Sequence, residues 1–213
     1  EGVRVLDLTR VLAGPLCTMM LGDMGADVVK IERPGRGDDT RAWGPPFVEG
    51  ESAYYLGVNR NKRSVALDTS TDEGKAQLGR LIREADVVID NYKHGTLARW
   101  GFDDAWFERE APRAVRCSIT GYGQTGPYRD RAGHDINYLA ISGVASHCGR
   151  ADSGPPPMGI QIADVAGGSH HAVMGILAAV IHRQNTGEGK FVDISMTDAA
   201  FALNAMAGAA ALA

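Results

Sequence analysis

A strand, a helix and a second strand within the first 32 residues constrain the fold more than any other feature of this sequence. Residues 3–8 alternate apolar and polar side chains, which predicts a strand. Pro15 then occupies a typical first position of a helix, and Gly25 ends that helix. Residues 27–32 predict the next strand. Such a unit implies a parallel sheet with right-handed crossovers.

The alternation of strands and helices continues along the chain. Further strands are predicted at residues 64–67, 86–90, 114–119 and 190–194. A capping box at residues 70–73 begins one of the intervening helices, and the nearly continuous apolar stretch at 165–181 predicts a buried one. The pattern favours an α/β fold with a doubly wound, mostly parallel sheet. With 213 residues, the chain is one large domain or one domain plus a fragment.

Two stretches depart from this alternation. Residues 33–61 are polar and rich in aromatic side chains but show little periodicity, so we interpret them as a long loop, a kind of segment that is often functional. Residues 199–213 are small and apolar with no helix stop signal. We expect them to form a helix that packs on something, and the chain to be a fragment.

The composition argues against several classes of function. A net charge of −4 provides no basic field for nucleic acid, and 44% hydrophobic residues are typical of a soluble globular protein. We find no apolar run long enough to span a bilayer and no signal peptide. Cys17, Cys117 and Cys148 are odd in number and lack CxxC spacing, so we expect reduced thiols and a cytoplasmic protein.

The run from Gly121 to Gly126 matches the pattern GxGxxG directly after a predicted strand. Taken alone, this match suggests a dinucleotide site. An apolar helix should follow, but residues 127–131 read Pro-Tyr-Arg-Asp-Arg, and no acidic residue stands where the ribose would need one. We therefore do not expect a nicotinamide cofactor.

A cluster of histidine and cysteine residues raises the question of a metal site. Its members are His147, Cys148, His170 and His171. Their spacing fits no structural zinc pattern, so we interpret them as ordinary polar residues near a helix and expect no metal.

Two candidate catalytic groups, His134 and Asp164, stand 30 residues apart. A histidine and an aspartate on either side of one carbon can remove a proton from one face and return it to the other. Asp164 alone could instead attack a thioester. A structural role explains these residues about equally well. His134 and Asp135 would cap the helix that begins near Ile136, and Asp164 would be stabilised by the dipole of its own helix.

Four longer motifs are specific enough to indicate a family. They lie at residues 7–15, 22–34, 61–64 and 121–127, and the first reads Asp-Leu-Thr-Arg-Val-Leu-Ala-Gly-Pro. Together they resemble the family III CoA-transferases, the group that includes formyl-CoA transferase, carnitine CoA-transferase and α-methylacyl-CoA racemase. The resemblance covers essentially the whole chain. In this family the glycine run at 121–126 is a structural loop.

The resemblance implies a Rossmann-like, CoA-binding α/β domain over residues 1–213, with acyl-CoA as substrate and no tightly bound cofactor. CoA would lie along the loops that follow the strands. The residues that motif position assigns to it are Arg33 at the nucleotide phosphates, Leu67, Asp68, Thr69 and Ser70 at the adenine, Asn91 and Arg99 near the pantetheine and phosphates, and Gly133, Asp135 and Tyr138 beside His134.

Members of this family form homodimers whose chains are threaded through each other, and they are longer than this chain. The resemblance therefore implies that a small domain and a returning C-terminal segment are absent here. An interlocked homodimer or a partner chain would supply them. The apolar residues 199–213 would otherwise expose core surface.

The motifs indicate two different reactions. Residues 37–47 resemble the transferases, including those that use dicarboxylates, whereas residues 133–138 and 163–168 resemble the racemase. Because function resides in the site, we give the second pair more weight. We expect a racemase in which His134 and Asp164 exchange the α-proton of a 2-methylacyl-CoA. One alternative is a CoA-transferase in which Asp164 forms an acyl anhydride and then an aspartyl-CoA thioester. Another is a truncated, inactive CoA-binding module.

Overall fold

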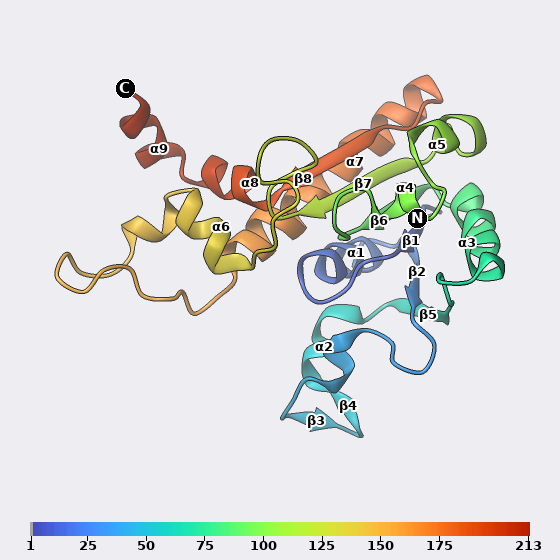
Figure 1. Ribbon diagram of the computed structural model, residues 1–213, viewed down its shortest axis with the longest axis horizontal. Helices are drawn as coiled ribbons and strands as arrows, with labels where there is room; N and C mark the ends of the chain where they lie inside the picture. The colour runs from blue at the N-terminus through green and yellow to red at the C-terminus, as the bar shows by residue number, and fades with distance from the viewer. Residues whose placement is uncertain (1) are drawn as a thin grey trace.

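The computed structural model describes residues 2–213 and contains a six-stranded sheet in which all neighbouring strands are parallel (Figure 1). Its strands are β1 (Arg4–Asp7), β2 (Asp27–Glu32), β5 (Lys62–Ala66), β6 (Val87–Asp90), β7 (Val115–Thr120) and β8 (Phe191–Ser195). Their spatial order is β5-β2-β1-β6-β7-β8. The chain winds outward from β1 and then outward from β6, so the prediction of a doubly wound α/β fold is confirmed.

Helices connect most of these strands, and two more follow the last strand. They are α1 (Ala13–Asp23), α2 (Ala53–Asn59), α3 (Asp72–Glu84), α4 (Thr96–Arg99), α5 (Asp104–Glu110), α6 (Asp135–Ile141), α7 (His171–Thr186), α8 (Met196–Leu203) and α9 (Ala205–Leu212). Two short helices of 3₁₀ type are η1 (Asp39–Ala42) and η2 (Val144–His147), and α7 continues from the π-helical segment η3 (Ala163–His170). A small hairpin pairs β3 (Phe47–Val48) with β4 (Glu51–Ser52).

The hydrophobic core has two layers, one on each face of the sheet. Alternate strand residues point to opposite faces, so Val87 joins one layer and Val88 the other. The first layer packs α1, η3 and α7 on the sheet, with Ile176 of α7 among its buried side chains. The second packs α3 and α5, with Leu78 of α3 fully buried. Burying each such side chain stabilises the fold by roughly 1.5–3 kcal/mol.

The predicted elements are present, and the largest differences lie in residues 33–61. This stretch is not an irregular loop, because it contains η1, the β3–β4 hairpin and α2. The short helix α2 has no amphipathic repeat long enough to be recognised from sequence. The helix α3 begins as predicted, but its cap is Thr71, whose hydroxyl accepts a hydrogen bond from the backbone N–H of Gly74 at 3.0 Å, and not the predicted pair Ser70 and Glu73.

One helical stretch, Ala163–Thr186, spans 24 residues and is apolar enough to cross a membrane by length and composition alone. The expectation that no apolar run reaches that length is therefore wrong. Within this stretch, Ala172, Ile176 and Ala179 are buried in the core. The core helix of a globular domain has these same properties, so the stretch is weak support for membrane insertion.

The apolar residues at 199–213 form two helices instead of one, because the chain breaks at Asn204 between α8 and α9. α9 extends away from the sheet (Figure 1), and its Met206 and Leu212 side chains are 91% and 78% exposed. Cys17, Cys117 and Cys148 are free thiols, which agrees with the prediction that they form no disulfide framework.

Candidate active site

The strand order reverses between β1 and β6, and the loops that leave these two strands form one wall of a crevice. Asn91, just after β6, joins the two loops by reciprocal hydrogen bonds to Arg10, just after β1. Its amide nitrogen donates to the Arg10 carbonyl at 2.7 Å, and its amide oxygen accepts from the Arg10 N–H at 3.0 Å. Asn91 therefore positions backbone at the crevice as well as lining it.

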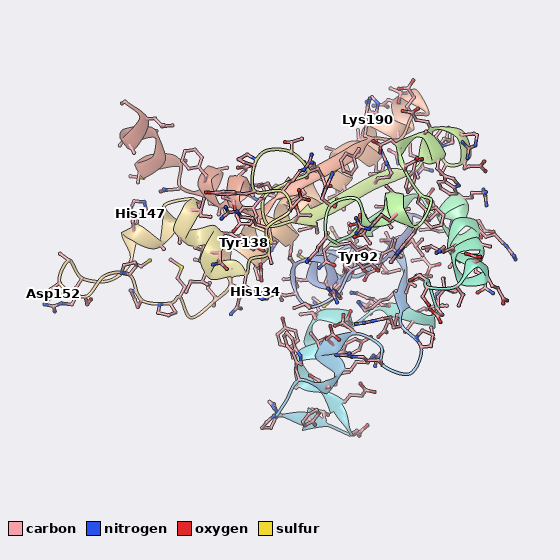
Figure 2. All side chains as sticks on the ribbon, in the orientation of Figure 1. Tyr92, His134, Tyr138, His147, Asp152 and Lys190 are labelled. Atoms are coloured by element: carbon pink, nitrogen blue, oxygen red, sulfur yellow. The ribbon has the colours of Figure 1, made fainter. Side chains whose placement is uncertain are left out.

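The crevice contains a cavity of about 300 Å³ that is lined by both candidate catalytic residues, which we call the Asp164 cavity. Its other walls include Asn91, Gly133 and Tyr138. Figure 2 shows His134 and Tyr138 on the same short segment, at the start of α6 and within it. The fold thus brings together His134 and Asp164, which are distant in sequence.

Asp135 does not cap its own helix α6. Instead, its carboxylate accepts a hydrogen bond from the backbone N–H of Asp164 at 3.0 Å. His134 is the N-cap residue of α6, and its backbone N–H donates to the side-chain oxygen of Asn137 at 2.9 Å. The expectation that Asp135 serves as a local cap is corrected accordingly. Its carboxylate fixes the first turn of η3, which carries Asp164.

The environment of Asp164 favours its neutral form. Burial and the negative charge of Asp135 raise the pKa of the Asp164 carboxyl to about 6, while His134 acts in the opposite direction. Burial also raises the pKa of Asp135, although the hydrogen bonds that it accepts from the Asp164 and Ala163 backbone oppose this. A carboxylate that titrates near pH 6 is ionised at neutral pH and remains a good proton acceptor.

Tyr138 closes one side of the cavity and is itself 5% exposed. Its ring packs edge-to-face on Tyr122, with the ring centroids 5.3 Å apart. Gly133 lies directly against this ring, since a Cβ atom built on Gly133 would come within 2.7 Å of it. A Cβ atom built on Gly121 would come closer still to the ring. The absence of side chains at these two glycines therefore makes room for Tyr138.

The loop between β1 and α1, which also lines the Asp164 cavity, has an unusual backbone. Val11 has a φ of 72°, which is rare for a β-branched residue. Its N–H donates to the carboxylate of Asp38 at 3.3 Å, and Asp38 pairs with Lys30 at 3.1 Å in a fully buried ion pair. Lys30 also donates to the carbonyl of Thr9 at 2.7 Å. This pair holds the strained loop in place.

A second cavity of about 320 Å³ adjoins the first and includes Arg33 and Thr69, so we call it the Arg33 cavity. Three arginines surround the carboxylate of Asp39, with Arg10, Arg33 and Arg36 at 3.5, 3.2 and 3.1 Å. Three cations around one anion leave a net positive charge at a half-exposed surface. Such a surface suits the phosphates of a nucleotide.

The other predicted CoA-binding residues differ in their positions. Leu67 is buried in the core and does not line the Arg33 cavity. Asp68 accepts hydrogen bonds from the N–H and hydroxyl of Ser70, which forms the turn before α3. Arg99 donates to the Thr96 hydroxyl at 2.8 Å and lines neither of the two cavities. Only Arg33 and Thr69 of the predicted nucleotide contacts therefore face the Arg33 cavity.

The Asp164 cavity has a cationic lining. Four permanent cations line it, namely Arg10, Lys93, Arg129 and Arg131, against the carboxylates of Asp130 and Asp164. None of these four cations was predicted as a site residue, because all four come from loops and their convergence depends on the tertiary fold. Such a lining favours an anionic ligand.

The glycine run 121–126 is a loop, as predicted, because β7 ends at Thr120 and the next helix begins at Asp135. Gly123 and Gly126 both have positive φ angles, near 80°. The backbone N–H of Gln124 donates to Asp193 in β8 at 2.9 Å, which fixes the loop to the neighbouring strand. Among residues 2–213, no group of three or more His, Cys, Asp or Glu side chains is arranged to hold a metal ion.

Comparison with known proteins was decisive for the family. The model of CoA-transferase family III matches residues 1–213. The chain belongs to the family III CoA-transferases. It is 49% identical over 204 residues to a succinate–glutarate CoA-transferase of Agrobacterium fabrum, covering 93% of this chain and 51% of that protein. It is 47% identical to the human succinyl-CoA:glutarate CoA-transferase, covering 92% of this chain and 44% of that protein.

Solved structures of this family have the same fold. A CaiB/BaiF family protein from Brucella suis is 41% identical with a TM-score of 0.90, covering 98% of this chain and 57% of that chain. Rv3272 from Mycobacterium tuberculosis is 33% identical with a TM-score of 0.91, covering 100% of this chain and 59% of that chain. This family III chain spans about half the length of the curated relatives it matches.

The family resemblance drawn from the four motifs is thus confirmed. The preference for a racemase has no support from these relatives, which are named as CoA-transferases. The comparisons favour the transferase that the sequence analysis had ranked second.

Proposed function

We propose that this chain carries the CoA-binding and nucleophile-bearing part of a CoA-transferase that moves CoA between dicarboxylic acids. The observation that carries the proposal is the cationic cavity around Asp164. The relatives in Agrobacterium fabrum and human, whose names specify succinate and glutarate, support the same substrate class. A dicarboxylate thioester keeps one free carboxylate, and a surplus of arginine and lysine in the cavity would bind it.

Asp164 would act as the nucleophile. Its carboxylate attacks the thioester carbonyl, the C–S bond breaks, and CoA leaves as a thiolate while an acyl-aspartyl anhydride forms. The thiolate then attacks the aspartyl carbonyl and releases the first carboxylic acid, which leaves CoA on Asp164 as a thioester. An incoming carboxylate repeats the two steps in reverse and restores free Asp164. Every bond broken is matched by one formed, and no further reactant is needed.

The pKa of Asp164 suits this role. A carboxyl with a pKa of about 6 is mostly ionised at neutral pH, yet it is a stronger nucleophile than a carboxylate of ordinary pKa. Asp135 would contribute twice, because it raises the pKa of Asp164 and holds the backbone of η3. His134 would orient the bound acyl group at the cavity wall.

The nucleotide end of CoA would lie at the Arg33 cavity. Arg10 and Lys93 line both cavities, so one extended ligand can reach from the arginine cluster to Asp164. Asn91 would contact the pantetheine arm between them, and Gly133 and Tyr138 the acyl end. Each of these assignments is part of the proposal.

A second candidate function is α-proton exchange by a racemase. Its specific observation is that His134 and Asp164 line one cavity, as two-face proton transfer requires. In that reaction one residue would remove the α-proton of a 2-methylacyl-CoA, and the other would return a proton to the opposite face.

We also propose that the rest of the active unit comes from an interlocked second copy or a partner chain. The exposed apolar side chains of α9 and the half-length match to the relatives support this. Activity and assembly should therefore be measured on the full natural polypeptide that carries this chain. Sedimentation of that polypeptide as a monomer would contradict an assembled site.

The two functions give different products. Incubation with succinyl-CoA and ¹³C-labelled glutarate in D₂O, followed by mass spectrometry, should yield labelled glutaryl-CoA without deuterium at the α-carbon. Asp164→Asn should abolish the transfer, and the exposed-residue variant Asp152→Asn should leave it unchanged. A 2-methylacyl-CoA that gains α-deuterium and loses its stereochemistry, with no movement of CoA, would establish the racemase instead.

A further inference from the structure

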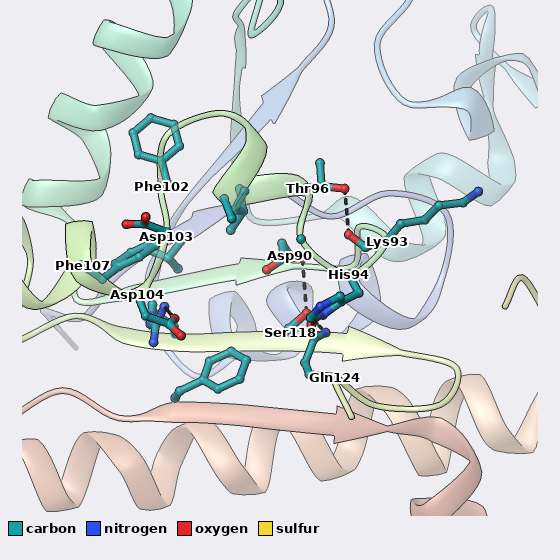
Figure 3. A pocket seen from close by; sticks show the side chains of 16 residues that line it. Asp90, Lys93, His94, Thr96, Phe102, Asp103, Asp104, Phe107, Ser118 and Gln124 are labelled. Atoms are coloured by element: carbon teal, nitrogen blue, oxygen red, sulfur yellow. Dashed lines mark hydrogen bonds and ion pairs between the residues drawn. The ribbon is translucent and has the colours of Figure 1, made fainter. Parts of the chain in front are cut away.

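A third cavity of about 230 Å³ lies beside the Asp164 cavity, against strands β6, β7 and β8 (Figure 3). We call it the Asp90 cavity. The aromatic rings of Phe102, Phe107 and Phe191 form much of its wall, and Asp90 lies at its inner end. His94 lines both this cavity and the Asp164 cavity. Lys93 also lines both, so these two neighbouring residues lie where the cavities meet.

A chain of hydrogen bonds joins His94 to Asp90 through two intervening side chains. The ring nitrogen Nδ1 of His94 lies 2.7 Å from Oε1 of Gln124. The amide nitrogen of Gln124 donates to the hydroxyl of Ser118 at 3.0 Å, and that hydroxyl donates to Asp90 at 3.3 Å. Figure 3 shows the four side chains in this sequence. Neither proposed reaction uses them.

The polarity of this chain follows from its end member. An ionised Asp90 can only accept, so the Ser118 hydroxyl must donate to it and must itself accept from Gln124. Gln124 then directs its amide nitrogen to Ser118 and its oxygen to His94. An amide oxygen only accepts, so Nδ1 of His94 must carry the proton. In a neutral imidazole, Nε2 is then a bare hydrogen-bond acceptor.

We propose that Gln124 is a positioning residue that transmits the charge state of Asp90 to His94 and holds the His94 imidazole in the Nδ1–H tautomer. The glycine loop serves this purpose, because Gly123 turns the chain at a φ of 78° and Asp193 anchors the backbone N–H of Gln124. The loop that resembles a dinucleotide motif thus supports a cavity-lining histidine.

Protonation of Asp90 reverses the chain. A protonated carboxyl can donate to Ser118, which can then donate to Gln124, and a rotated amide would donate to Nδ1 and leave the proton on Nε2. Burial raises the pKa of Asp90 to about 6, against the Tyr92 backbone N–H, the Ser118 hydroxyl and the charge of Arg116. The Nδ1–H tautomer therefore dominates above about pH 6.

Other titratable groups near this chain do not alter its polarity. Tyr92 and Cys117 lie close to Asp90, and burial raises the pKa of each, so both are neutral at physiological pH. Lys93 precedes His94, and Arg99 donates to the His94 backbone carbonyl at 3.4 Å. Neither cation is a member of the hydrogen-bond chain.

The consequence is a hydrogen-bond acceptor at the junction of the two cavities. A ligand group that donates, such as an amide N–H, would be bound there, and a carboxylate would be disfavoured. On the proposed function, which this part of the inference requires, the donor would be an amide N–H of the pantetheine arm of acyl-CoA. The tautomer itself does not depend on that function.

Nitrogen NMR of ¹⁵N-histidine-labelled protein tests the tautomer directly, because protonated and bare ring nitrogens have well-separated resonances. The signal of His94 is identified by its loss in His94→Asn. At about pH 8, His94 of the wild type should show a protonated Nδ1 and a bare Nε2. Below about pH 6, the population of the Nε2–H tautomer should increase. Gln124→Met should shift the ring toward Nε2–H, the form that free histidine favours. The matched control Gln77→Met, exposed on α3, should not.

Two results would overturn the proposal: a wild-type Nε2–H tautomer at about pH 8, or an unchanged tautomer in a folded Gln124→Met variant. If Gln124→Met does not fold, Ser118→Ala is used in its place, because it breaks the same hydrogen-bond chain. Calorimetry with CoA tests the proposed pantetheine contact separately from the tautomer of His94. We expect about tenfold weaker CoA binding for Gln124→Met, and equal binding with a changed tautomer would exclude the pantetheine contact. Absence of CoA binding by the wild type would contradict the proposed function alone.

Discussion

Replacement of Asp164 by asparagine should stabilise the protein while abolishing its activity. The ionised carboxylate is disfavoured by burial and by the nearby charge of Asp135, which together raise its pKa from 3.8 to about 6. Because one pH unit of pKa change corresponds to about 1.4 kcal/mol, the ionised group costs the folded state about 3 kcal/mol above pH 6. Residual solvent screening reduces this, so we expect a gain of about 1–3 kcal/mol.

The stabilisation by Asp164→Asn varies with pH in a way that identifies its cause. In the unfolded chain Asp164 titrates near 3.8, so below that pH both states are protonated and the variant has no advantage. As pH rises from 3.8 to about 6, the folded wild type loses stability relative to the variant, and above that the difference is constant. Wild-type activity should rise around pH 6, from about pH 5 to about pH 7, because the nucleophile must be ionised in the folded protein.

Urea denaturation at about pH 8 and about pH 4 measures this difference, and a thermal melt should show a rise of about 2–10 °C at the higher pH. Asp152→Asn, at an exposed loop position, is the matched control and should change stability little. A variant that is less stable than the wild type at about pH 8, or equally stabilised at both pH values, would refute the argument.

Lys30→Met should lower the free energy of unfolding by about 3–5 kcal/mol in urea denaturation, because it leaves Asp38 charged and buried without its partner. Gly133→Ala should reduce the rate of CoA transfer at least about tenfold, because the new Cβ would come within 2.7 Å of the Tyr138 ring at the cavity wall, and steady-state kinetics measure this. Arg33→Ala should weaken CoA binding about tenfold in calorimetry, through loss of a charge-assisted phosphate contact.

Each of these three variants has a matched control in the same chain. Arg63→Met breaks an exposed ion pair and should cost less than about 1 kcal/mol. Gly57→Ala adds a methyl group where no atom lies within 4 Å, so the transfer rate should not change. Arg36→Ala removes a more exposed arginine from the same Asp39 cluster and should affect CoA binding less. A control that matches its test variant would show that the effect is not specific to the site.

Local patterns in the sequence were sufficient for the sheet, because strand alternation and helix periodicity depend on neighbours along the chain. β2 has the predicted bounds of residues 27–32. The same alternation was uninformative for Lys30, whose fully buried ammonium pairs with Asp38 in a loop. Nothing local indicates that a loop carboxylate will meet a strand lysine, so the support for the Val11 loop could not be predicted.

Short sequence stretches named two candidate site residues, but contacts formed by the tertiary fold could not be predicted. His134 and Asp164 were both recognised, and they line one cavity. For Asp135 a local capping rule offered one interpretation and the family resemblance offered CoA binding, whereas its hydrogen-bond partner is the backbone of Asp164, 29 residues away. Asp90 and His94 lie at the end of β6 and just after it, whereas Gln124 follows β7, and no sequence pattern relates them.

The central claim is that Asp164 forms a covalent intermediate in CoA transfer, and trapping that intermediate tests it most directly. The full natural polypeptide is mixed with succinyl-CoA, quenched with hydroxylamine, digested and analysed by mass spectrometry. An activated aspartyl carbonyl reacts with hydroxylamine to give a hydroxamate, so the peptide that contains Asp164 should gain the corresponding mass only when succinyl-CoA is present. An unmodified Asp164 peptide from enzyme that is actively transferring CoA would contradict the account.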